Sequence, residues 1–386
     1  MRRRANPVAV PAMPAARVST LELFFDLVFV FTITQLTAVL ANTITVVVTL
    51  RVMLMLAIIL WMYGGYAWLT NAITPNTRYR RTFFLVGMGG FLGIALSIPD
   101  AFGSTGWLFG LGYFVVNGVH SGLILAVAGP NARRVFSRLG PFNLATATLV
   151  LVGGFLPLGW RYGLWAAALV LLVISPYVNP ISGFALSPAH FVERHGLLII
   201  IALGESVVAI GAGVAGQEIT FGLVVVAMLG LSVTYLLWWL YFAGDDTAAE
   251  RALETMDPAR RARAALEAYG WAHYVLLLGI VATAAGVKKA VAHPVGHLTW
   301  AQALVLAGGV ATYLLGDVWF RRVLRIGRLR YRLLGAVAML ATVPIGDAWA
   351  VGQLLLLIGF IVAVLYAEEF DLRRGLSGED VEQPAT

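Results

Sequence analysis

The 386-residue chain contains no cysteine, which excludes a disulfide framework, a thiolate metal site and catalysis by a thiol. Charged side chains are also scarce, at 12% of the residues, whereas hydrophobic residues make up 60%. The mean hydropathy of +0.83 is far above what a soluble domain of this length needs. The composition therefore predicts a protein embedded in a lipid bilayer.

The long apolar runs predict an all-α, polytopic membrane protein with about twelve transmembrane helices. Most runs approach the roughly 20 residues that a spanning helix needs, and none shows the alternating segments of an outer-membrane barrel. The fifth and sixth runs are short and could be merged or tilted. The expected helices cover residues 21–40, 46–71, 82–98, 107–128, 142–158, 162–176, 190–213, 221–243, 267–287, 298–320, 331–345 and 348–368.

The distribution of Lys and Arg predicts how these helices are oriented, because basic residues concentrate in cytoplasmic loops. With the N-terminus inside, only Arg51, Arg161, Lys288 and Lys289 of the 27 basic residues fall near the outer face. A miscount of one helix would invert every later loop and destroy this bias. We therefore expect both termini in the cytoplasm. The net charge of +7 then reflects topology, with anionic lipid at the cytoplasmic face as a possible partner, and not nucleic-acid binding.

The chain divides into two halves of six expected helices each. A basic cytoplasmic tail at 1–20 precedes a first bundle at 21–178, and a proline-rich loop at 179–189 leads to a second bundle at 190–370 and a cytoplasmic tail at 371–386. Glu22 and Glu193 open the first and seventh helices, which suggests two parallel repeats with a site between them. Aromatic clusters that end the second and eighth helices fit the same duplication, although ordinary interfacial aromatic belts would produce part of this likeness.

Two carboxylates, Glu22 and Asp26, lie four residues apart on one face of the first expected helix. An acid at the centre of a membrane helix costs about 2.5–3.5 kcal/mol, so such groups face protein or water. The acids also argue that this run is a retained helix and not a signal peptide. In an alternative interpretation, Glu22 and Glu193 cap the starts of their helices. Asp26 alternatively forms a structural pair with Arg194 of the seventh helix.

The seventh expected helix carries the most deeply placed acid. Glu205, followed by Ser206, lies about 18 Å along the helix from Glu193, near the middle of the bilayer. We expect no basic residue at that depth, so Glu205 is the leading candidate for holding a proton or an ion. Burial would favour its protonated form.

Other polar residues have a structural and a functional interpretation. In the fourth expected helix, Tyr113, Asn117 and His120 form a stripe that fits interhelical hydrogen bonding better than a binding role. His273 fits a packing histidine better than a proton carrier. Asp317 and Arg321 are spaced for an i, i+4 ion pair.

Signatures of catalysis and metal binding are weak. The chain has no HExxH, P-loop or GxSxG sequence in its required context. His190, Glu193 and His195 offer at most a poor metal set, because an acid and an imidazole two residues apart lie on different helix faces. We expect no metal, no cofactor and no catalytic residue.

The segments LELFFDLVFVFTITQLT and ERHGLLIIIALGESVVAIG resemble the bacterial low temperature requirement A family. The likeness extends through His273-Tyr274 and through GVATYLLGDVWFR at 309–321. It implies a multi-pass protein of the bacterial inner membrane that is linked to growth in the cold, without a defined biochemical activity. His195 stands where the family pattern has an aromatic residue such as Phe. The positions that match the pattern are Glu22, Asp26, Glu193, Gly196, Gly204, Glu205 and Ser206.

A fainter similarity is to potassium channels with twelve helices in two groups of six. Their pore helix begins Phe-Ser-Asp, and this chain has Phe24-Phe25-Asp26 without the serine.

These observations predict a transport-type function in which Asp26 and Glu205 line a polar cavity that binds a cation, a proton or a small polar solute. One alternative is a membrane enzyme that acts on lipid or a lipid-linked substrate, with Glu193, His195 or Glu205 at a lateral opening. Another is a structural or sensing protein in which every polar residue is paired. The candidate binding residues are Glu22, Asp26, Glu193, Arg194, Glu205 and Ser206, with Tyr113, Asn117, His120 and His273 as secondary candidates.

Overall fold

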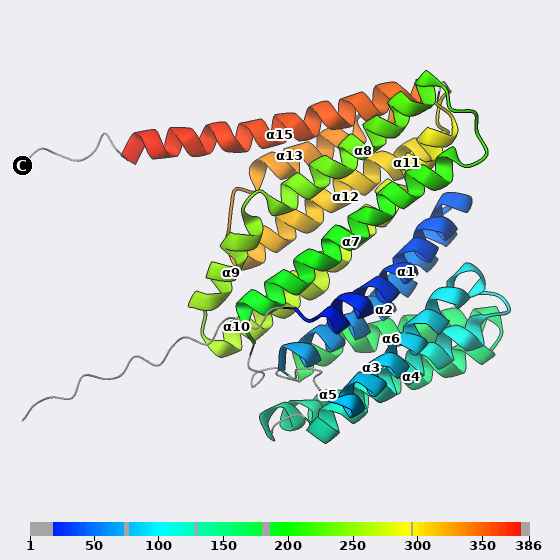
Figure 1. The fold of residues 1–386 in the computed structure, drawn as a ribbon, viewed down its shortest axis with the longest axis vertical. Helices are drawn as coiled ribbons and strands as arrows, with labels where there is room; N and C mark the ends of the chain where they lie inside the picture. Colours follow the sequence, from blue (N-terminus) through cyan, green and yellow to red (C-terminus); the bar gives the residue numbers. More distant parts are fainter. Residues whose placement is uncertain (1–17, 73–76, 128–129, 180–185, 295, 380–386) are drawn as a thin grey trace, which may run out of the picture.

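The computed structural model describes residues 18–72, 77–127, 130–179, 186–294 and 296–379, and every regular element within them is helical (Figure 1). The all-α prediction is therefore confirmed. A 3-10 turn, η1 (Ile98–Asp100), follows α3, and a π-helical segment, η2 (Leu266–Ala272), joins α10 to α11. The helices up to residue 178 are α1 (Thr20–Asn42), α2 (Val46–Ala72), α3 (Arg78–Ser97), α4 (Gly106–Val127), α5 (Pro130–Phe155) and α6 (Leu158–Val178). Those that follow are α7 (Pro188–Val214), α8 (Phe221–Phe242), α9 (Asp245–Thr255), α10 (Pro258–Ala265), α11 (His273–Ala292), α12 (Trp300–Leu324), α13 (Arg330–Leu340), α14 (Val343–Ala348) and α15 (Ala350–Glu379).

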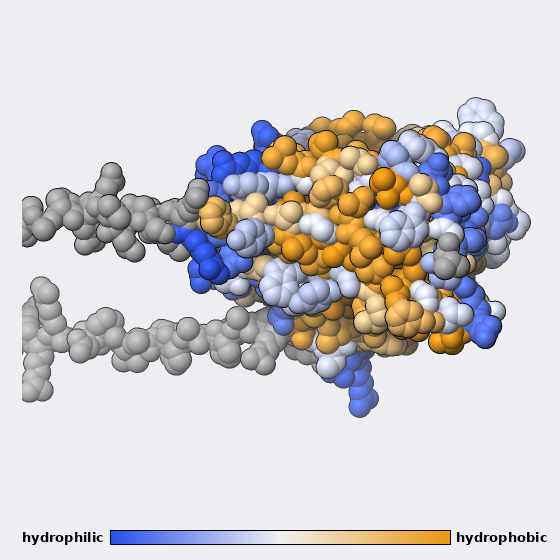
Figure 2. All heavy atoms as spheres, turned by 90° about the horizontal axis from the view of Figure 1, so that it is seen from above, coloured by the Kyte–Doolittle hydropathy of each residue, from blue (hydrophilic) through white to orange (hydrophobic). Residues whose placement is uncertain are grey.

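Ten helices of the described chain are long and apolar enough to cross a membrane. The other two expected spans coincide with α5, which opens with Arg133, Arg134 and Arg138, and with the pair α13 and α14. The latter pair is interrupted just before Pro344, because a proline ring clashes with the preceding helical turn. Figure 2 shows hydrophobic side chains across the middle of one face and hydrophilic ones at its two ends. This pattern fits a helical bundle embedded in lipid.

Several helix bounds differ from the sequence expectation. α5 begins at Pro130, twelve residues before the expected start at residue 142, and continues through Pro141. Membrane helices tolerate proline where neighbouring groups satisfy the freed carbonyl. α15 continues to Glu379, so the start of the expected tail at 371–386 is helical. The segment between the eighth and ninth expected helices forms α9 and α10. The N-terminal tail and most of the proline-rich loop lie outside the described residues.

Helix α1 lies between two groups of helices. It contacts α2 and α3 on one side and α7 and α11 on the other (Figure 1). α1 begins and α15 ends on the same side of the bundle, at the left of Figure 1. The contact between α1 and α7 brings the two acid-bearing helices together.

Helices α11 and α12 pack closely together, and four glycines, two on each helix with a spacing of seven residues, make this approach possible. A Cβ atom on Gly279 would lie 2.5 Å from the backbone nitrogen of Tyr313, and one on Gly286 would lie 2.6 Å from Cα of Leu306. On α12, Gly309 faces the backbone of Thr283 in the same way, as Gly316 faces Leu276. Small residues at such contacts let membrane helices pack backbone to backbone.

Replacing Gly309 with leucine is therefore expected to separate α11 from α12. We expect the free energy of unfolding to fall by about 1–3 kcal/mol or more, the range for overpacking a close-packed interior. Titration of the detergent-purified protein with sodium dodecyl sulfate measures this loss. The matched control is Gly308→Leu, because a Cβ atom at Gly308 meets nothing within 4 Å. Equal stability of the two variants would contradict the assigned role of Gly309.

Candidate functional site

An arginine of α7 is clamped between two carboxylates of α1. Arg194 Nη1 donates to Glu22 Oε1 at 3.0 Å, and Nη2 donates to Asp26 Oδ1 at 3.1 Å. Arg194 and Asp26 are fully buried, and Glu22 is 2% exposed. The predicted Asp26–Arg194 pair is thus present, and Glu22 extends it to a three-membered cluster. The two carboxylates compensate the guanidinium charge, which the membrane interior would otherwise make very costly.

Residues from a third helix and from the start of α7 complete this cluster. Arg194 Nη1 also donates to the hydroxyl of Thr70 on α2. His190 Nε2 lies 3.3 Å from Glu22 Oε1, and His190 Nδ1 lies 3.4 Å from Asn71 Nδ2. One tautomer satisfies both contacts: Asn71 donates to Nδ1, and the Nε2–H group donates to Glu22. The cluster therefore joins α1, α2 and α7.

Local helix-start signals position these acids. Ser19 is the N-cap of α1 and forms a capping box with Glu22, so the cap interpretation of Glu22 is confirmed together with its ion pair. α7 begins at Pro188, which puts Glu193 in the second turn and not at the cap. The cap interpretation of Glu193 is therefore wrong, because the helix starts earlier than the apolar run indicated. Glu193 is exposed and accepts a hydrogen bond from the Val18 amide at 3.4 Å.

Glu205 lies deeper along the contact between α7 and α1. It is 4% exposed, and its Oε2 accepts a hydrogen bond of 2.6 Å from the hydroxyl of Thr34 on α1. Within the described residues, no Lys, Arg or His side chain forms an ion pair with it. Ser206 is fully buried beside it, and its hydroxyl has no hydrogen-bond partner among the described residues. The structure therefore holds Glu205 by a neutral partner, whereas Asp26 is held by a cation.

The secondary candidates are all buried, but they differ in their hydrogen bonds. Asn117 donates from Nδ2 to the carbonyl of Asn143 on α5 at 3.2 Å, which confirms the predicted interhelical hydrogen bond. The Tyr113 hydroxyl and His120 Nδ1 have no partner among the described residues. His273 is fully buried, with Nε2 at 2.9 Å from the Tyr241 hydroxyl and Nδ1 at 2.8 Å from the carbonyl of Ala268. Both of its ring nitrogens are satisfied, as expected for a packing histidine.

A second ionic cluster joins α9, α12, α13 and α15. The predicted pair of Asp317 and Arg321 is present at 3.5 Å, but Arg321 binds Asp245 more closely, at 2.6 Å. Arg332 contacts Asp317 and donates from Nε to Glu368 at 3.0 Å. Sequence reasoning found only the i, i+4 pair, because the other partners come from helices far apart in the chain. In the sequence, the one indication of these partners was a charged residue at the end of an apolar run.

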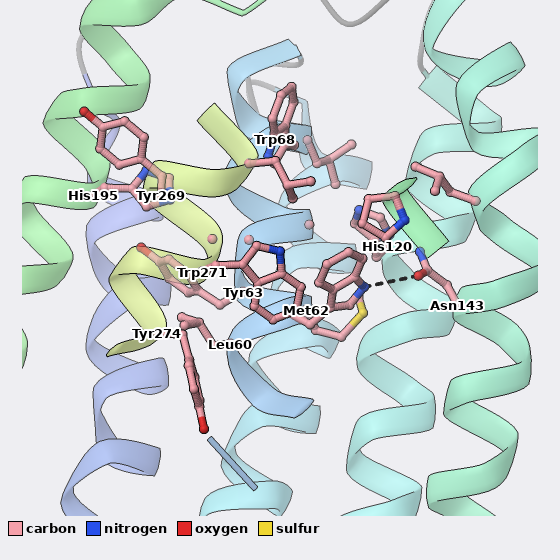
Figure 3. Close-up of a pocket in the computed structure, with 18 of the residues that line it drawn as sticks. Leu60, Met62, Tyr63, Trp68, His120, Asn143, His195, Tyr269, Trp271 and Tyr274 are labelled. Carbon is pink, nitrogen blue, oxygen red and sulfur yellow. Dashed lines mark hydrogen bonds between the residues drawn. The ribbon is translucent and has the colours of Figure 1, made fainter. Parts of the chain in front are cut away.

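A cavity with mainly aromatic walls was not anticipated, and neither Asp26 nor Glu205 lines it. That these two acids line a polar cavity of their own stays a prediction. The aromatic cavity has a volume of about 120 Å³ and lies between α2, α4, α5, α7 and η2 (Figure 3). The aromatic cluster at the end of α2 is the sequence feature that could have indicated this cavity. Its members Tyr63 and Tyr66 are fully buried and are not part of an interfacial belt. Its aromatic and polar lining consists of Trp61, Tyr63, Trp68, His120, Phe136, Asn143, Phe191, His195, Tyr269, Trp271 and Tyr274.

The weak metal set does not converge. His190 faces Glu22, Glu193 is exposed, and His195 Nδ1 lies 2.8 Å from the carbonyl of Phe191. Among the residues that the structure describes, no group of three or more His, Asp or Glu side chains is arranged to hold a metal ion. His195 instead packs in an aromatic setting, with ring centres 4.4 Å from Phe191 and 4.9 Å from Tyr269. This explains how it occupies a position where an aromatic residue was expected.

Comparison with known proteins relates this chain to a family and to an individual protein. The profile of the family described as "Bacterial low temperature requirement A protein (LtrA)" matches residues 17–367. An uncharacterized protein of Rhizobium meliloti (strain 1021) is 31% identical over 317 residues, which cover 78% of this chain and 76% of the relative. The residues matched by the profile include the Arg194 cluster, Glu205, the lining of the aromatic cavity and, except for Glu368, the second ionic cluster.

Proposed function

The chain belongs to the bacterial low temperature requirement A family, and from that premise we propose that this integral membrane protein moves a cation, a proton or a small polar solute. The observation that carries this proposal is the buried Glu205 between α7 and α1, with the Thr34 hydroxyl as its partner. A carboxylate without a cationic partner inside a membrane protein is expensive to keep charged, so it readily exchanges a proton or binds a cation. Glu205 is therefore the exchanging group.

The ionic cluster of Arg194 has a different role in this proposal. Asp26 and Glu22 already share Arg194 as a cationic partner, so they are weaker sites for a second cation than Glu205, which has none among the described residues. They instead hold α1 against α7 at one end, while the contact between Thr34 and Glu205 lies further along the same pair of helices. A solute that competes for Glu205 would loosen α1 from α7 around this fixed end.

The proposed topology has twelve spans in two related groups of six. It adds α5 and the pair of α13 and α14 to the ten apolar helices. An even number of spans fits the start of α1 and the end of α15, which lie on the same side of the bundle (Figure 1). We place both termini in the cytoplasm and the protein in the bacterial inner membrane. Exposed basic residues such as Arg251, Arg260 and Arg263 then face anionic lipid head groups.

Reconstituted protein tests the proposal through Glu205→Gln, which removes the exchangeable proton and keeps the shape of the side chain. We expect the natural protein to dissipate an imposed pH gradient, or a gradient of potassium or sodium, several-fold faster than empty liposomes. The glutamine variant is expected to lose this excess flux, as read from a trapped pH-sensitive or ion-sensitive dye. Glu218→Gln, an exposed acid just after α7, is the matched control.

Growth in the cold provides an independent readout. A strain without the protein is expected to regain cold growth with the natural protein and with Glu218→Gln, but not with Glu205→Gln. The transport proposal fails if the reconstituted protein shows no flux above empty liposomes while the Glu205→Gln variant fully restores cold growth.

A membrane enzyme that acts on a lipid or a lipid-linked substrate is the second candidate. One observation favours it: His195 lines the aromatic cavity, which is partly open to the surroundings. Neither Glu193 nor Glu205 lines that cavity, so His195 has no acidic partner there. Turnover of added membrane lipid that is lost in His195→Phe, the residue type expected at this position, would favour the enzyme over the transporter.

A further inference from the structure

The aromatic cavity has walls suited to a flat ring. The Trp61 and Trp271 ring centres lie 5.9 Å apart, and Trp68 and Tyr274 add further aromatic faces. In Figure 3, Trp271 and Tyr274 come from one side of the cavity, and His120 and Asn143 come from the other. Aromatic rings stack favourably on one another in offset or edge-to-face arrangements. The size of about 120 Å³ is of the order that holds one six-membered ring.

The lining also offers hydrogen-bond donors that no described residue uses. Trp271 Nε1 and His120 Nδ1 have no partner there, and His120 is 5% exposed. An indole nitrogen only donates, and Nδ1 of a neutral histidine donates in the tautomer that carries the proton there. Buried polar groups of this kind cost free energy until a partner arrives. A ligand that carries acceptor oxygens would therefore satisfy them.

The lack of charged side chains in the described lining excludes a strongly ionic ligand. No Asp, Glu, Lys or Arg side chain is among the described residues that line the cavity. A charged ligand would therefore lose its hydration without gaining an opposite charge on the wall. An uncharged ligand does not incur this cost.

We propose that this cavity binds an uncharged ring compound with hydrogen-bond-accepting oxygens, the chemical class of the quinones. The ring packs against the aromatic faces from α2 and η2, and its oxygens accept hydrogen bonds from Trp271 and from the Nδ1–H tautomer of His120. This inference rests on the cavity alone and not on transport through Glu205, which lies ten residues, or about 15 Å, along α7 from His195.

Two probes of nearly equal shape test this ligand class. Duroquinone carries two carbonyl oxygens on a tetramethyl ring, and durene is the same ring without them. We expect calorimetry on the detergent-purified protein to show duroquinone binding about tenfold or more tightly than durene, since one or two net hydrogen bonds separate them. Equal affinities, no binding of duroquinone, or selective binding of tetramethylammonium would overturn the proposal.

A cavity-filling variant places the binding in this cavity. Gly64 lines it, and a Cβ atom there meets nothing within 4 Å, so Gly64→Leu fills the space without displacing a neighbour. We expect this variant to weaken duroquinone binding more than tenfold. Gly118→Leu, at a glycine with equally open surroundings outside the lining, is expected to bind as the natural protein does. Equal effects of the two substitutions would place the ligand elsewhere.

A milder substitution guards against misfolding of the filled variant. Trp271→Phe keeps an aromatic face and removes the Nε1–H donor. It is expected to weaken duroquinone binding while leaving durene binding nearly unchanged. Loss of both ligands to the same extent would contradict the assigned hydrogen bond.

Discussion

Replacing Arg194 with methionine is expected to lower the free energy of unfolding by about 3–5 kcal/mol, the cost of removing one partner from a buried ion pair. The variant leaves Glu22 and Asp26 in the contact between α1 and α7 without a cation. Arg194 and Asp26 are fully buried, so water does not replace the lost guanidinium. The loss is measured by unfolding the detergent-purified protein with sodium dodecyl sulfate.

Two controls separate this mechanism from a general effect of the substitution. Arg251→Met changes an exposed arginine of α9 and is expected to cost less than about 0.5 kcal/mol. A triple variant with Glu22→Gln, Asp26→Asn and Arg194→Met removes the whole set of charges and is expected to recover much of the lost stability, because neutral replacement of a buried cluster is often tolerated. If the triple variant is less stable than Arg194→Met alone, the uncompensated acids are not the cause.

The second large effect is expected for Arg332→Met, in the ionic cluster of α9, α12, α13 and α15. Arg332 is 1% exposed and contacts the fully buried Asp317, with Glu368 at 3.0 Å and Asp245 at 3.4 Å. Its removal leaves three carboxylates with Arg321 as their remaining cationic partner among the described residues. We expect a loss of about 3–5 kcal/mol in the same unfolding assay.

Arg330, two residues earlier on α13, provides the matched control. Its side chain is 62% exposed and pairs with Asp371 at the surface. Exposed ion pairs contribute about 0–1 kcal/mol, so Arg330→Met is expected to be nearly neutral. An Arg332→Met variant as stable as Arg330→Met would show that the buried cluster does not hold these four helices together.

Variants of Arg194 and Arg332 also distinguish an effect on stability from an effect on ligand binding. Arg332 lies outside the aromatic cavity and has no contact with Glu205, so folded Arg332→Met protein is expected to retain duroquinone binding. Arg194 lies 5.6 Å from the ring centre of Tyr63, which lines the cavity. Substitution of Arg194 is therefore expected to affect ligand binding as well as unfolding.

The sequence alone was sufficient for features that depend on one helix or on composition. Hydropathy placed α1, α2, α7 and α8 within a few residues of their observed bounds, because a spanning helix must be long and apolar whatever its neighbours are. Helix spacing put Glu22 and Asp26 on one face. The need to neutralise a buried acid made Arg194 a reasonable partner, and Asp26 and Arg194 do pair.

Only the tertiary structure decided which helix faces meet. Asp26 pairs with Arg194, while Glu205 accepts a hydrogen bond from Thr34, a partner on α1 that the sequence did not indicate. The ionic cluster of Arg332 and the aromatic cavity draw residues from four or more helices. Periodicity shows which side chains share a face of one helix, but it carries no information on how that helix is rotated against its neighbours. Packing of all helices together sets those rotations, and with them the location of every shared site.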